Sequence, residues 1–287
     1  MTRIVTSTVT SPGEGRPLMT VDGALRDAAA RLSGISPTAR LDAELLMAHA
    51  LGIDRGGLLL GDRGGAAPDA FAGYVARRAA REPVAYITGR RDFWTISLAV
   101  TPDVLIPRPD SETLIEAAID HFAGRAPPAR ILDLGTGSGA LLLAALAEWP
   151  EATGVGVDIS APALAVARAN AAALGFSGRA HFVEGGWRGD ARADLVLCNP
   201  PYIGTDEALP AGVTDYEPAG ALWAGADGLD DYRAIAPLLD FAEGGVAVIE
   251  IGIGQGESAA RLFRDAGFAV AVRRDLEGRN RALVVTR

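Results

Sequence analysis

The stretch Ile131-Leu-Asp-Leu-Gly-Thr-Gly-Ser-Gly139 decides the fold of this chain, and an apolar run from Ala140 to Ala147 follows it directly. The residues before the glycines are mostly apolar, which predicts a buried strand. Glycines at alternate positions let the backbone turn tightly and approach a ligand closely. This part of the sequence therefore predicts a strand, a tight loop and a helix.

The same alternation of strand and helix extends over the rest of the chain from residue 130 onward. Seven candidate strands are short and apolar: Arg130–Leu134, Thr153–Asp158, Ala180–Val183, Ala193–Cys198, Val246–Ile251, Phe268–Val272 and Arg281–Val285. Helical patterns lie between most of them, at Leu141–Glu148, Pro162–Leu174, Ile235–Phe241 and Glu257–Ala266. We expect an α/β fold with a seven-stranded, doubly wound sheet in residues 107–287, which binds ligands at the carboxyl ends of its strands.

The residues before the sheet divide into three further segments. Residues 1–19 are rich in Thr, Ser, Gly and Pro, and we expect a disordered tail. Residues 20–83 are expected to form a helical domain whose last helix ends before Pro83. Residues 84–106 are expected to form a β-hairpin linker with strands at 84–88 and 93–100. The apolar faces of the helical domain consist of Leu25, Ala28, Ala29 and Leu32, and of Leu41, Leu45, Ala48 and Leu51.

The composition excludes several classes of protein. The 27 basic residues are all arginine, and 36 acidic residues give a net charge of −9. The absence of lysine excludes a Walker-type phosphate site and a Schiff base, and the acidity argues against general attraction to nucleic acid. One cysteine, Cys198, and three scattered histidines predict no disulfide and no metal site. With neither a signal peptide nor a long apolar span, we expect a cytoplasmic monomer with no membrane partner.

A strand-end acid accompanies the glycine loop. Gly154-Val-Gly-Val-Asp158 forms the next predicted strand, and its carboxylate can accept hydrogen bonds from both ribose hydroxyls. The glycine spacing is one residue tighter than the dinucleotide fingerprint, and no lysine follows to hold phosphate. The combination predicts a nucleoside ligand and favours S-adenosylmethionine over NAD. A tight turn without a ligand is the plainer interpretation of the glycine loop alone.

A second motif, Asn199-Pro-Pro-Tyr202, follows the strand that ends at Cys198. The prolines stiffen the backbone, so the Pro200 carbonyl and the Asn199 side-chain oxygen provide two fixed acceptors for a planar NH₂ group. Tyr202 offers a ring face to a flat substrate. An amide NH₂ is a poor nucleophile, and two acceptors raise its electron density and orient its lone pair toward a sulfonium methyl group. The motif therefore predicts methyl transfer to an amide or aromatic nitrogen, although a structural turn at the end of the strand is the alternative.

With these motifs the chain resembles the HemK/PrmC protein-(glutamine-N5) methyltransferases, which modify peptide chain release factors. The resemblance covers nearly the whole chain after residue 20. It rests on Asp42-Ala-Glu-Leu-Leu, Pro83-Val-Ala-Tyr-Ile-Thr-Gly89, Phe93-Trp94, Ile106-Pro-Arg-Pro-Asp-Ser-Glu112, Asp133-Leu-Gly-Thr-Gly-Ser-Gly139, Asn199-Pro-Pro-Tyr202, Tyr216-Glu-Pro218 and Glu250-Ile-Gly252. It implies a Rossmann-like methyltransferase domain with S-adenosylmethionine as cofactor, a release factor as protein substrate, and a helical domain that recognises it.

The resemblance also implies roles for individual residues. Asp158 would hold the ribose, and Trp187 would lie against the adenine. Asn199 would contact both the cofactor and the substrate amide. The methionine end of the cofactor would be wrapped by Gly135, Thr136, Gly137, Ser138 and Gly139. The catalytic and substrate-binding candidates are Asn199, Pro200, Pro201 and Tyr202, and the pocket walls would include Phe93, Arg108, Pro109 and Glu112.

Some alternatives stay open at this stage. Arg108 could form a salt bridge with Asp110 or Glu112 instead of lining the pocket, and Glu250 could be a structural acid at a strand end. The family usually has an acid directly before the tryptophan, whereas this chain has Gly186, which predicts weaker cofactor binding unless Glu184 takes over. This departure keeps open a paralogue that methylates a small metabolite or peptide. An adenine-N6 nucleic-acid methyltransferase and a cofactor-binding module without catalysis are further alternatives.

Overall fold

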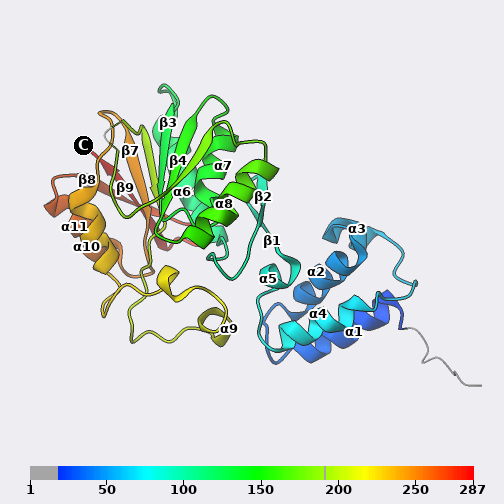
Figure 1. Ribbon diagram of the computed structural model, residues 1–287. Coiled ribbons are helices and arrows are strands. Elements are labelled where there is room, and N and C mark those ends of the chain that lie inside the picture. The colour runs from blue at the N-terminus through cyan, green and yellow to red at the C-terminus, as the bar shows by residue number, and fades with distance from the viewer. Residues whose placement is uncertain (1–18, 191) are drawn as a thin grey trace, which may run out of the picture. The chain divides into compact units, whose positions relative to one another are not determined.

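The structure is a computed structural model that describes residues 19–190 and 192–287 (Figure 1). The chain divides into two compact units, one ending at Ile87 and the other running from Thr88 to Arg287. The tail prediction for residues 1–19 falls, apart from Met19, outside the described residues. Within the described part of the chain, no helix has the length and apolar character that crossing a bilayer would need.

The first unit is built from short helices around a core of its own. Its helices are α1 (Val21–Leu32), α2 (Ala39–Leu51), α3 (Arg55–Leu60), α4 (Ala70–Ala79) and the start of α5 (Val84–Thr88). The Thr20 hydroxyl caps α1 by accepting a hydrogen bond from the Gly23 N–H. Gly52 ends α2 in the left-handed conformation, with φ of 68°. Residues of α1, α2 and α4, Leu25, Met47 and Phe71 among them, are packed together in its core.

The apolar face predicted for α2 is mostly on the wrong side of the helix. Leu41, Leu45 and Leu51 are exposed, and only Ala48 of the predicted set is buried. The core instead takes Leu46 and Met47 with their neighbours. Because α2 carries apolar residues around most of its circumference, helical spacing alone does not select the buried face.

The predicted hairpin strand at residues 84–88 is also wrong. These residues form α5, in which the N–H groups of Tyr86 and Ile87 donate to the Pro83 carbonyl. Proline suits the first turn of a helix, and Gly89, with φ of 68°, ends it. The hairpin consists of β1 (Arg90–Phe93) and β2 (Ile96–Ala99), so its turn lies at residues 94–95 instead of 89–92.

The second unit contains the predicted seven-stranded sheet, in the order β5-β4-β3-β6-β7-β9-β8. β3 to β7 are parallel, and β9 lies antiparallel between β7 and β8. The chain order therefore reverses at β3, where β4 lies on one side and β6 on the other. The strands are β3 (Arg130–Leu134), β4 (Thr153–Asp158), β5 (Ala180–Glu184), β6 (Leu195–Cys198), β7 (Val246–Glu250), β8 (Ala269–Arg274) and β9 (Asn280–Thr286).

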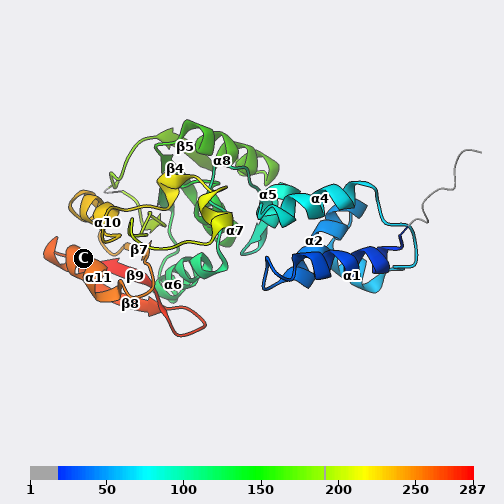
Figure 2. The ribbon, with the colours of Figure 1, turned by 90° about the horizontal axis from the view of Figure 1, so that it is seen from below.

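Helices cover both faces of this sheet, so the unit has three layers (Figures 1 and 2). One face packs against α6 (Glu112–Phe122), α7 (Ala140–Glu148) and α8 (Ala161–Ala173), and the hairpin packs on α7 and α8. The other face packs against α10 (Asp230–Ile235) and α11 (Gly256–Asp265). The helix predicted at 235–241 instead begins at Asp230, with a 3-10 turn at Ala236–Leu238, and α6 was not predicted.

Candidate active site

The glycine loop joins β3 to α7 at the reversal point of the sheet. Gly135, Gly137 and Gly139 all have positive φ values, of 70°, 53° and 84°. A Cβ at Gly135 would also lie 3.1 Å from the Trp187 ring, whereas at Gly137 it would meet no atom within 4 Å. Glycine is therefore required at Gly135 by space and conformation, and at Gly137 by conformation alone.

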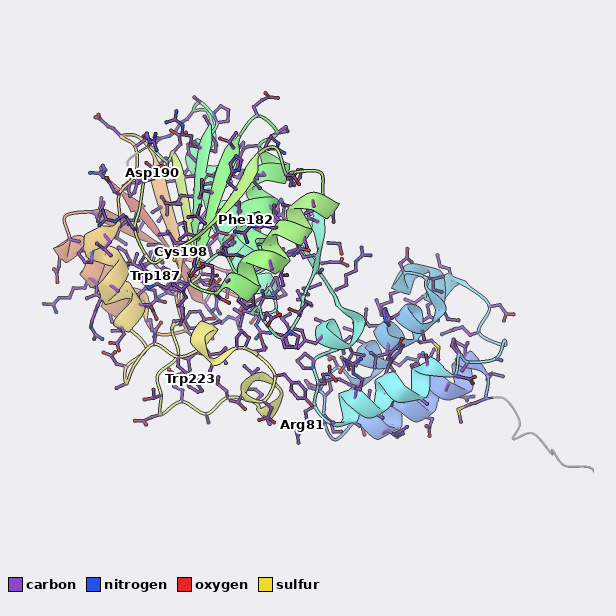
Figure 3. All side chains as sticks on the ribbon, in the orientation of Figure 1. Arg81, Phe182, Trp187, Asp190, Cys198 and Trp223 are labelled. Carbon is purple, nitrogen blue, oxygen red and sulfur yellow. The ribbon has the colours of Figure 1, made fainter. Side chains whose placement is uncertain are left out.

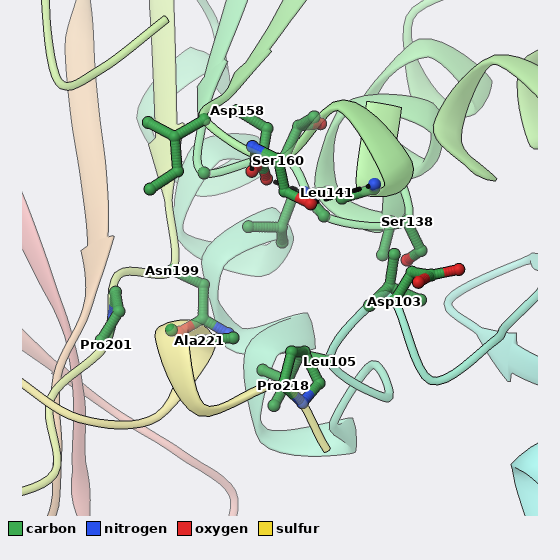
Figure 4. Close-up of a pocket in the computed structure, with 18 of the residues that line it drawn as sticks. Asp103, Leu105, Ser138, Leu141, Asp158, Ser160, Asn199, Pro201, Pro218 and Ala221 are labelled. Atoms are coloured by element: carbon green, nitrogen blue, oxygen red, sulfur yellow. Dashed lines mark hydrogen bonds between the residues drawn. The ribbon is translucent and has the colours of Figure 1, made fainter. Parts of the chain in front are cut away.

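Asp158, at the end of β4, is tied to this loop. Its Oδ2 accepts a hydrogen bond of 2.8 Å from the Gly137 N–H, and its Oδ1 accepts one of 2.9 Å from the Ser160 N–H. Figure 4 shows Asp158 and Ser160 together at the wall of the pocket. Two backbone donors therefore fix the carboxylate at the edge where a ligand would lie, and each oxygen keeps a further lone pair.

A cavity of about 290 Å³ lies at the carboxyl ends of β3, β4 and β6. It brings together most of the predicted site residues: Phe93, Gly135, Thr136, Gly137, Ser138, Asp158, Trp187, Asn199 and Pro201. Gly139, Pro200, Tyr202, Arg108 and Glu112 are not among its lining residues. The rest of the wall includes Asp103, Val104, Leu105, Pro218, Gly220 and Ala221, to which no role was assigned from the sequence, although Pro218 belongs to the quoted Tyr216-Glu-Pro218 motif.

Asn199 projects from the end of β6 into this cavity (Figure 4). Its Nδ2 donates a hydrogen bond of 3.2 Å to the Ser111 Oγ. Ser111 belongs to the Ile106–Glu112 motif, but it lies 88 residues from Asn199 along the chain and no role was predicted for it. The oxygen of the Asn199 amide consequently faces away from this contact.

Tyr202 does not lie where the motif suggested. Its hydroxyl donates to the Glu250 Oε1 at 3.3 Å. Its ring packs against the hydrophobic core on the sheet face that α10 and α11 cover. Burial raises the pKa of the Tyr202 phenol, and the nearby Glu250 carboxylate raises it further. Tyr202 is therefore a protonated donor that holds Glu250, and its ring is not a wall of the cavity.

Trp187 and Cys198 lie at the same end of the sheet (Figure 3). The Trp187 Nε1 donates a hydrogen bond of 3.0 Å to the Asp231 Oδ1, which orients the indole beside Gly135. Cys198 is fully buried, and burial raises the pKa of its thiol well above the ordinary value. Glu184, the suggested replacement for an acid at position 186, does not line the cavity.

The segment from Arg108 to Glu112 is held by partners far along the chain. The Arg108 guanidinium forms a 2.5 Å salt bridge with Glu217, so the alternative pairing with Asp110 or Glu112 is wrong. The Glu112 Oε1 accepts from the Trp94 N–H at 2.9 Å. Trp94 has φ of 53°, and this bond supports its unusual backbone at the hairpin turn.

Asp110 of the same segment pairs with the buried Arg281 of β9 at 2.9 Å. Arg281 also lies 3.7 Å from Asp275. The pairs Arg108–Glu217 and Asp110–Arg281 were not predicted, because no local pattern links residues so distant in sequence. The salt bridge from Asp110 to Arg281 and the hydrogen bond from Asn199 to Ser111 hold the 3-10 turn Pro109–Ser111 against the end of the sheet.

Arg108→Ala is expected to lower the free energy of unfolding by about 2–3 kcal/mol, because the buried Glu217 carboxylate would lose its charged partner. Urea unfolding measures the change. The double variant Arg108→Ala/Glu217→Gln should recover part of the loss, since a neutral amide needs no charged partner. Equal stability of Arg108→Ala and the wild type would show that the salt bridge contributes nothing.

Two buried carboxyls lie beneath the site. Burial raises the pKa of Asp133 to about 7, although its carboxylate accepts hydrogen bonds from the Thr136 hydroxyl and the Leu142 N–H at 2.6 and 3.3 Å. Burial also raises the pKa of Glu250 to about 7, opposed by Ser111, Arg281 and Tyr202. In each carboxyl one oxygen has no hydrogen-bond partner. Because burial raises both pKa values to about 7, the two groups titrate near neutrality.

Comparison with known proteins shows the class of protein to which this chain belongs. Residues 111–213 match the family model of the methyltransferase small domain, and residues 23–89 match that of the PrmC N-terminal domain. The solved catalytic domain of hMettl16 in complex with MAT2A 3'UTR hairpin 6 shares the fold, with a TM-score of 0.52 and 15% identity over 74% of this chain and 81% of that chain. Fold, glycine loop and family models together define an S-adenosylmethionine-dependent methyltransferase.

Curated relatives narrow this class to one family. The release factor glutamine methyltransferase of Rhodospirillum rubrum is 42% identical over 290 residues, covering 96% of this chain and 88% of that protein. The protein of the same name from Cereibacter sphaeroides is 46% identical over 270 residues, covering 90% of this chain and 95% of the relative. The chain belongs to the release factor glutamine methyltransferase family.

Gly186→Asp is expected to tighten binding of S-adenosylmethionine by roughly 10- to 100-fold, because a charge-assisted hydrogen bond to the adenine amino group contributes ~1.5–3 kcal/mol. A Cβ at Gly186 would meet no atom within 4 Å, so the new side chain has room. Calorimetric titration measures the affinity. Gly178→Asp, at a position equally open, is the matched control. Unchanged affinity in Gly186→Asp would mean that the acid is not needed here.

Proposed function

We propose that this methyltransferase methylates the side-chain amide nitrogen, N5, of a glutamine in a protein, and that this glutamine belongs to the Gly-Gly-Gln loop of peptide chain release factors in the cytoplasm. The names of the relatives support this substrate. The observation that carries the proposal is the placement of Asn199. Its amide lies at the cavity that also contains the glycine loop, and Ser111 binds the nitrogen end of that amide.

The residues around the cavity suit S-adenosylmethionine. The positive φ values of the glycine loop bring bare backbone to the cavity wall, where the methionine part would lie. The Asp158 carboxylate is oriented by two backbone donors and can accept from the ribose hydroxyls. The Trp187 ring offers an apolar face to the adenine. When bound, this cofactor supplies an electrophilic methyl group on a sulfonium sulfur.

The chain itself has to make an amide nitrogen reactive. The nitrogen lone pair of glutamine is delocalised into the carbonyl, so the free amide is a weak nucleophile. In the proposed complex the Asn199 Oδ1 accepts one N–H proton of the substrate, and the carbonyl of the adjacent Pro200, a residue that does not itself line the cavity, accepts the other. These bonds orient the nitrogen and stabilise the positive charge that develops on it. No strong base is required before transfer, because the nitrogen becomes acidic only after it is methylated.

The helical unit is proposed to recognise the protein substrate. Residues 20–83 have a core of their own, and α2 leaves Leu41, Leu45 and Leu51 exposed. Exposed apolar side chains on one helix suit a protein partner better than a nucleic acid. The net charge of −9 also disfavours direct binding of nucleic acid.

The proposal is tested by incubating the purified protein with methyl-labelled S-adenosylmethionine and a bacterial release factor. Peptide mass spectrometry then locates the methyl group. A single methyl group on the Gly-Gly-Gln glutamine is expected, and a release factor with asparagine at that position should stay unmodified. If the protein binds the cofactor but modifies no release factor, the substrate assignment is wrong. Methylation of small amides or peptides alone would favour the paralogue.

A further inference from the structure

The two ends of the Asn199 amide have the same shape but opposite hydrogen-bonding character. The oxygen accepts, as a substrate NH₂ requires, whereas the nitrogen only donates. A rotation of half a turn about the last side-chain bond would present two donors to each other and abolish binding of the substrate nitrogen. Catalysis therefore needs something that selects one orientation of this amide.

Ser111 is the group in contact with the nitrogen end of the amide. Its Oγ accepts from Asn199 Nδ2 at 3.2 Å, and the serine is only 3% exposed. A hydroxyl can equally well donate, in which case it would attract the oxygen end of Asn199 instead. Ser111 alone therefore does not decide the orientation. The direction of its own proton does.

Glu250 supplies that direction. Its carboxylate is fully buried at the end of β7, and the nearby Ser111 hydroxyl acts to lower its pKa. The Glu250 Oε2 has no hydrogen-bond partner, so it is free to accept a hydrogen bond from Ser111. The Glu250 Oε1 receives the Tyr202 hydroxyl at 3.3 Å. An ionised carboxylate only accepts, so a Ser111 proton turned toward Glu250 would satisfy the unpartnered Oε2 and leave the serine lone pairs for Asn199.

We propose that Ser111 and Glu250 are positioning residues that hold the Asn199 amide with its oxygen toward the substrate nitrogen. This inference rests on the proposed function, since it assigns the device that prepares Asn199 for an NH₂ substrate. Neither residue touches the substrate or the cofactor in this scheme. Both act through the orientation of Asn199.

Ionisation of Glu250 then controls the device. Protonated Glu250 can donate to Ser111, whose proton is then free to turn toward Asn199 and reverse the amide. Because burial raises the pKa of Glu250 to about 7, activity should rise as the pH rises through neutrality. The charged or titratable groups that act on Glu250 from the surrounding elements are Tyr202, Tyr232, Cys198, Asp110 and Arg281.

The test measures kcat at saturating cofactor and release factor between about pH 6 and pH 8.5, where the ionisation falls. Ser111→Ala is expected to lower kcat by roughly 10- to 100-fold, the usual cost of misplacing a reacting group. Glu250→Gln, which is isosteric, should lower kcat and remove its rise with pH. Both should keep the calorimetric affinity for S-adenosylmethionine within a few-fold of the wild type.

One control variant separates positioning from folding, and measurement at saturating cofactor separates the titration of Glu250 from that of Asp133. Asp194→Asn neutralises a carboxylate at the opposite end of β6, where it accepts from the Ala129 and Arg130 N–H groups, and should behave as the wild type. Asp133 also has a pKa raised to about 7, but it lies under the glycine loop. Its titration should change cofactor affinity, which saturation removes from kcat.

The outcomes are distinct. Wild-type kcat in Ser111→Ala would overturn the positioning role, and an unchanged pH profile in Glu250→Gln would overturn the part of Glu250. Parallel losses of kcat and cofactor affinity, together with a lower melting temperature, would show a structural role only. If the wild type itself transfers no methyl group to a release factor, the proposed function fails and the positioning role fails with it.

Discussion

Asn199→Ala is expected to lower kcat for release factor methylation by roughly 100- to 1,000-fold, the range found when one preorganised hydrogen-bonding group is removed from a polar transition state. The variant deletes the acceptor for the substrate nitrogen and leaves Ser111 without its amide partner. Cofactor affinity should change far less, because the glycine loop and Asp158 stay in place. Single-turnover methylation and calorimetry measure the two quantities separately.

Asn280→Ala is the control for this variant, because it deletes an amide of the same size that does not line the cavity. Its kcat should equal that of the wild type. Asn199→Asp adds a second comparison, since it keeps an acceptor but loses the donor to Ser111. An Asn199→Ala enzyme with more than about a tenth of the wild-type kcat would contradict the role given to the amide.

Asp158→Ala is expected to raise the dissociation constant for S-adenosylmethionine by roughly 100-fold or more, because two charge-assisted hydrogen bonds to the ribose contribute ~1.5–3 kcal/mol each. The loss has a second origin in the structure. The Gly137 and Ser160 N–H groups would have no carboxylate to donate to, so the glycine loop would be less ordered before binding. Isothermal titration calorimetry measures the affinity directly.

The chain offers a matched control at the other end of the sheet. Asp194 also accepts two backbone N–H bonds, each 2.9 Å long, from Ala129 and Arg130. Asp194→Ala should therefore lower stability by a similar amount while leaving cofactor affinity unchanged. Equal affinities of Asp158→Ala and Asp194→Ala would mean that the Asp158 carboxylate does not hold the ribose.

The α/β half of the molecule was predictable because each strand and loop carries its own local signal. The bounds of β3 and β4 agree with the prediction residue for residue, since glycines end or interrupt the apolar runs there. The segment 84–88 shows the limit of this approach. Its β-branched residues favoured a strand, but Pro83 and Gly89 provide a start and an end for a single helical turn.

The buried face of α2 was predicted wrongly for a different reason. Its leucines repeat on one side and Leu46 and Met47 lie on another, so either face could have been buried. Only packing against α1 and α4 decides between them. Tertiary contacts of this kind are not present in a local pattern.

The site residues also divide into those with a local sequence signal and those placed by contacts between distant segments. The glycine loop, Asp158 and Asn199 could be found because they belong to contiguous motifs at strand ends. The partners that hold them could not, because Ser111 and Glu217 lie 88 and 109 residues from Asn199 and Arg108. Tyr202 was found in the motif, but its direction depends on Glu250, 48 residues further along the chain.

The position of β9 has a consequence for synthesis of the protein on the ribosome. β9 is the last strand of the sheet in chain order, yet it lies between β7 and β8 and carries Arg281, the partner of Asp110. Until residues 280–286 have left the exit tunnel, β7 remains an open edge and the turn that contains Ser111 lacks one of its anchors. The nascent chain can therefore bury most of its core early, but it acquires a complete active site only after the last strand has emerged.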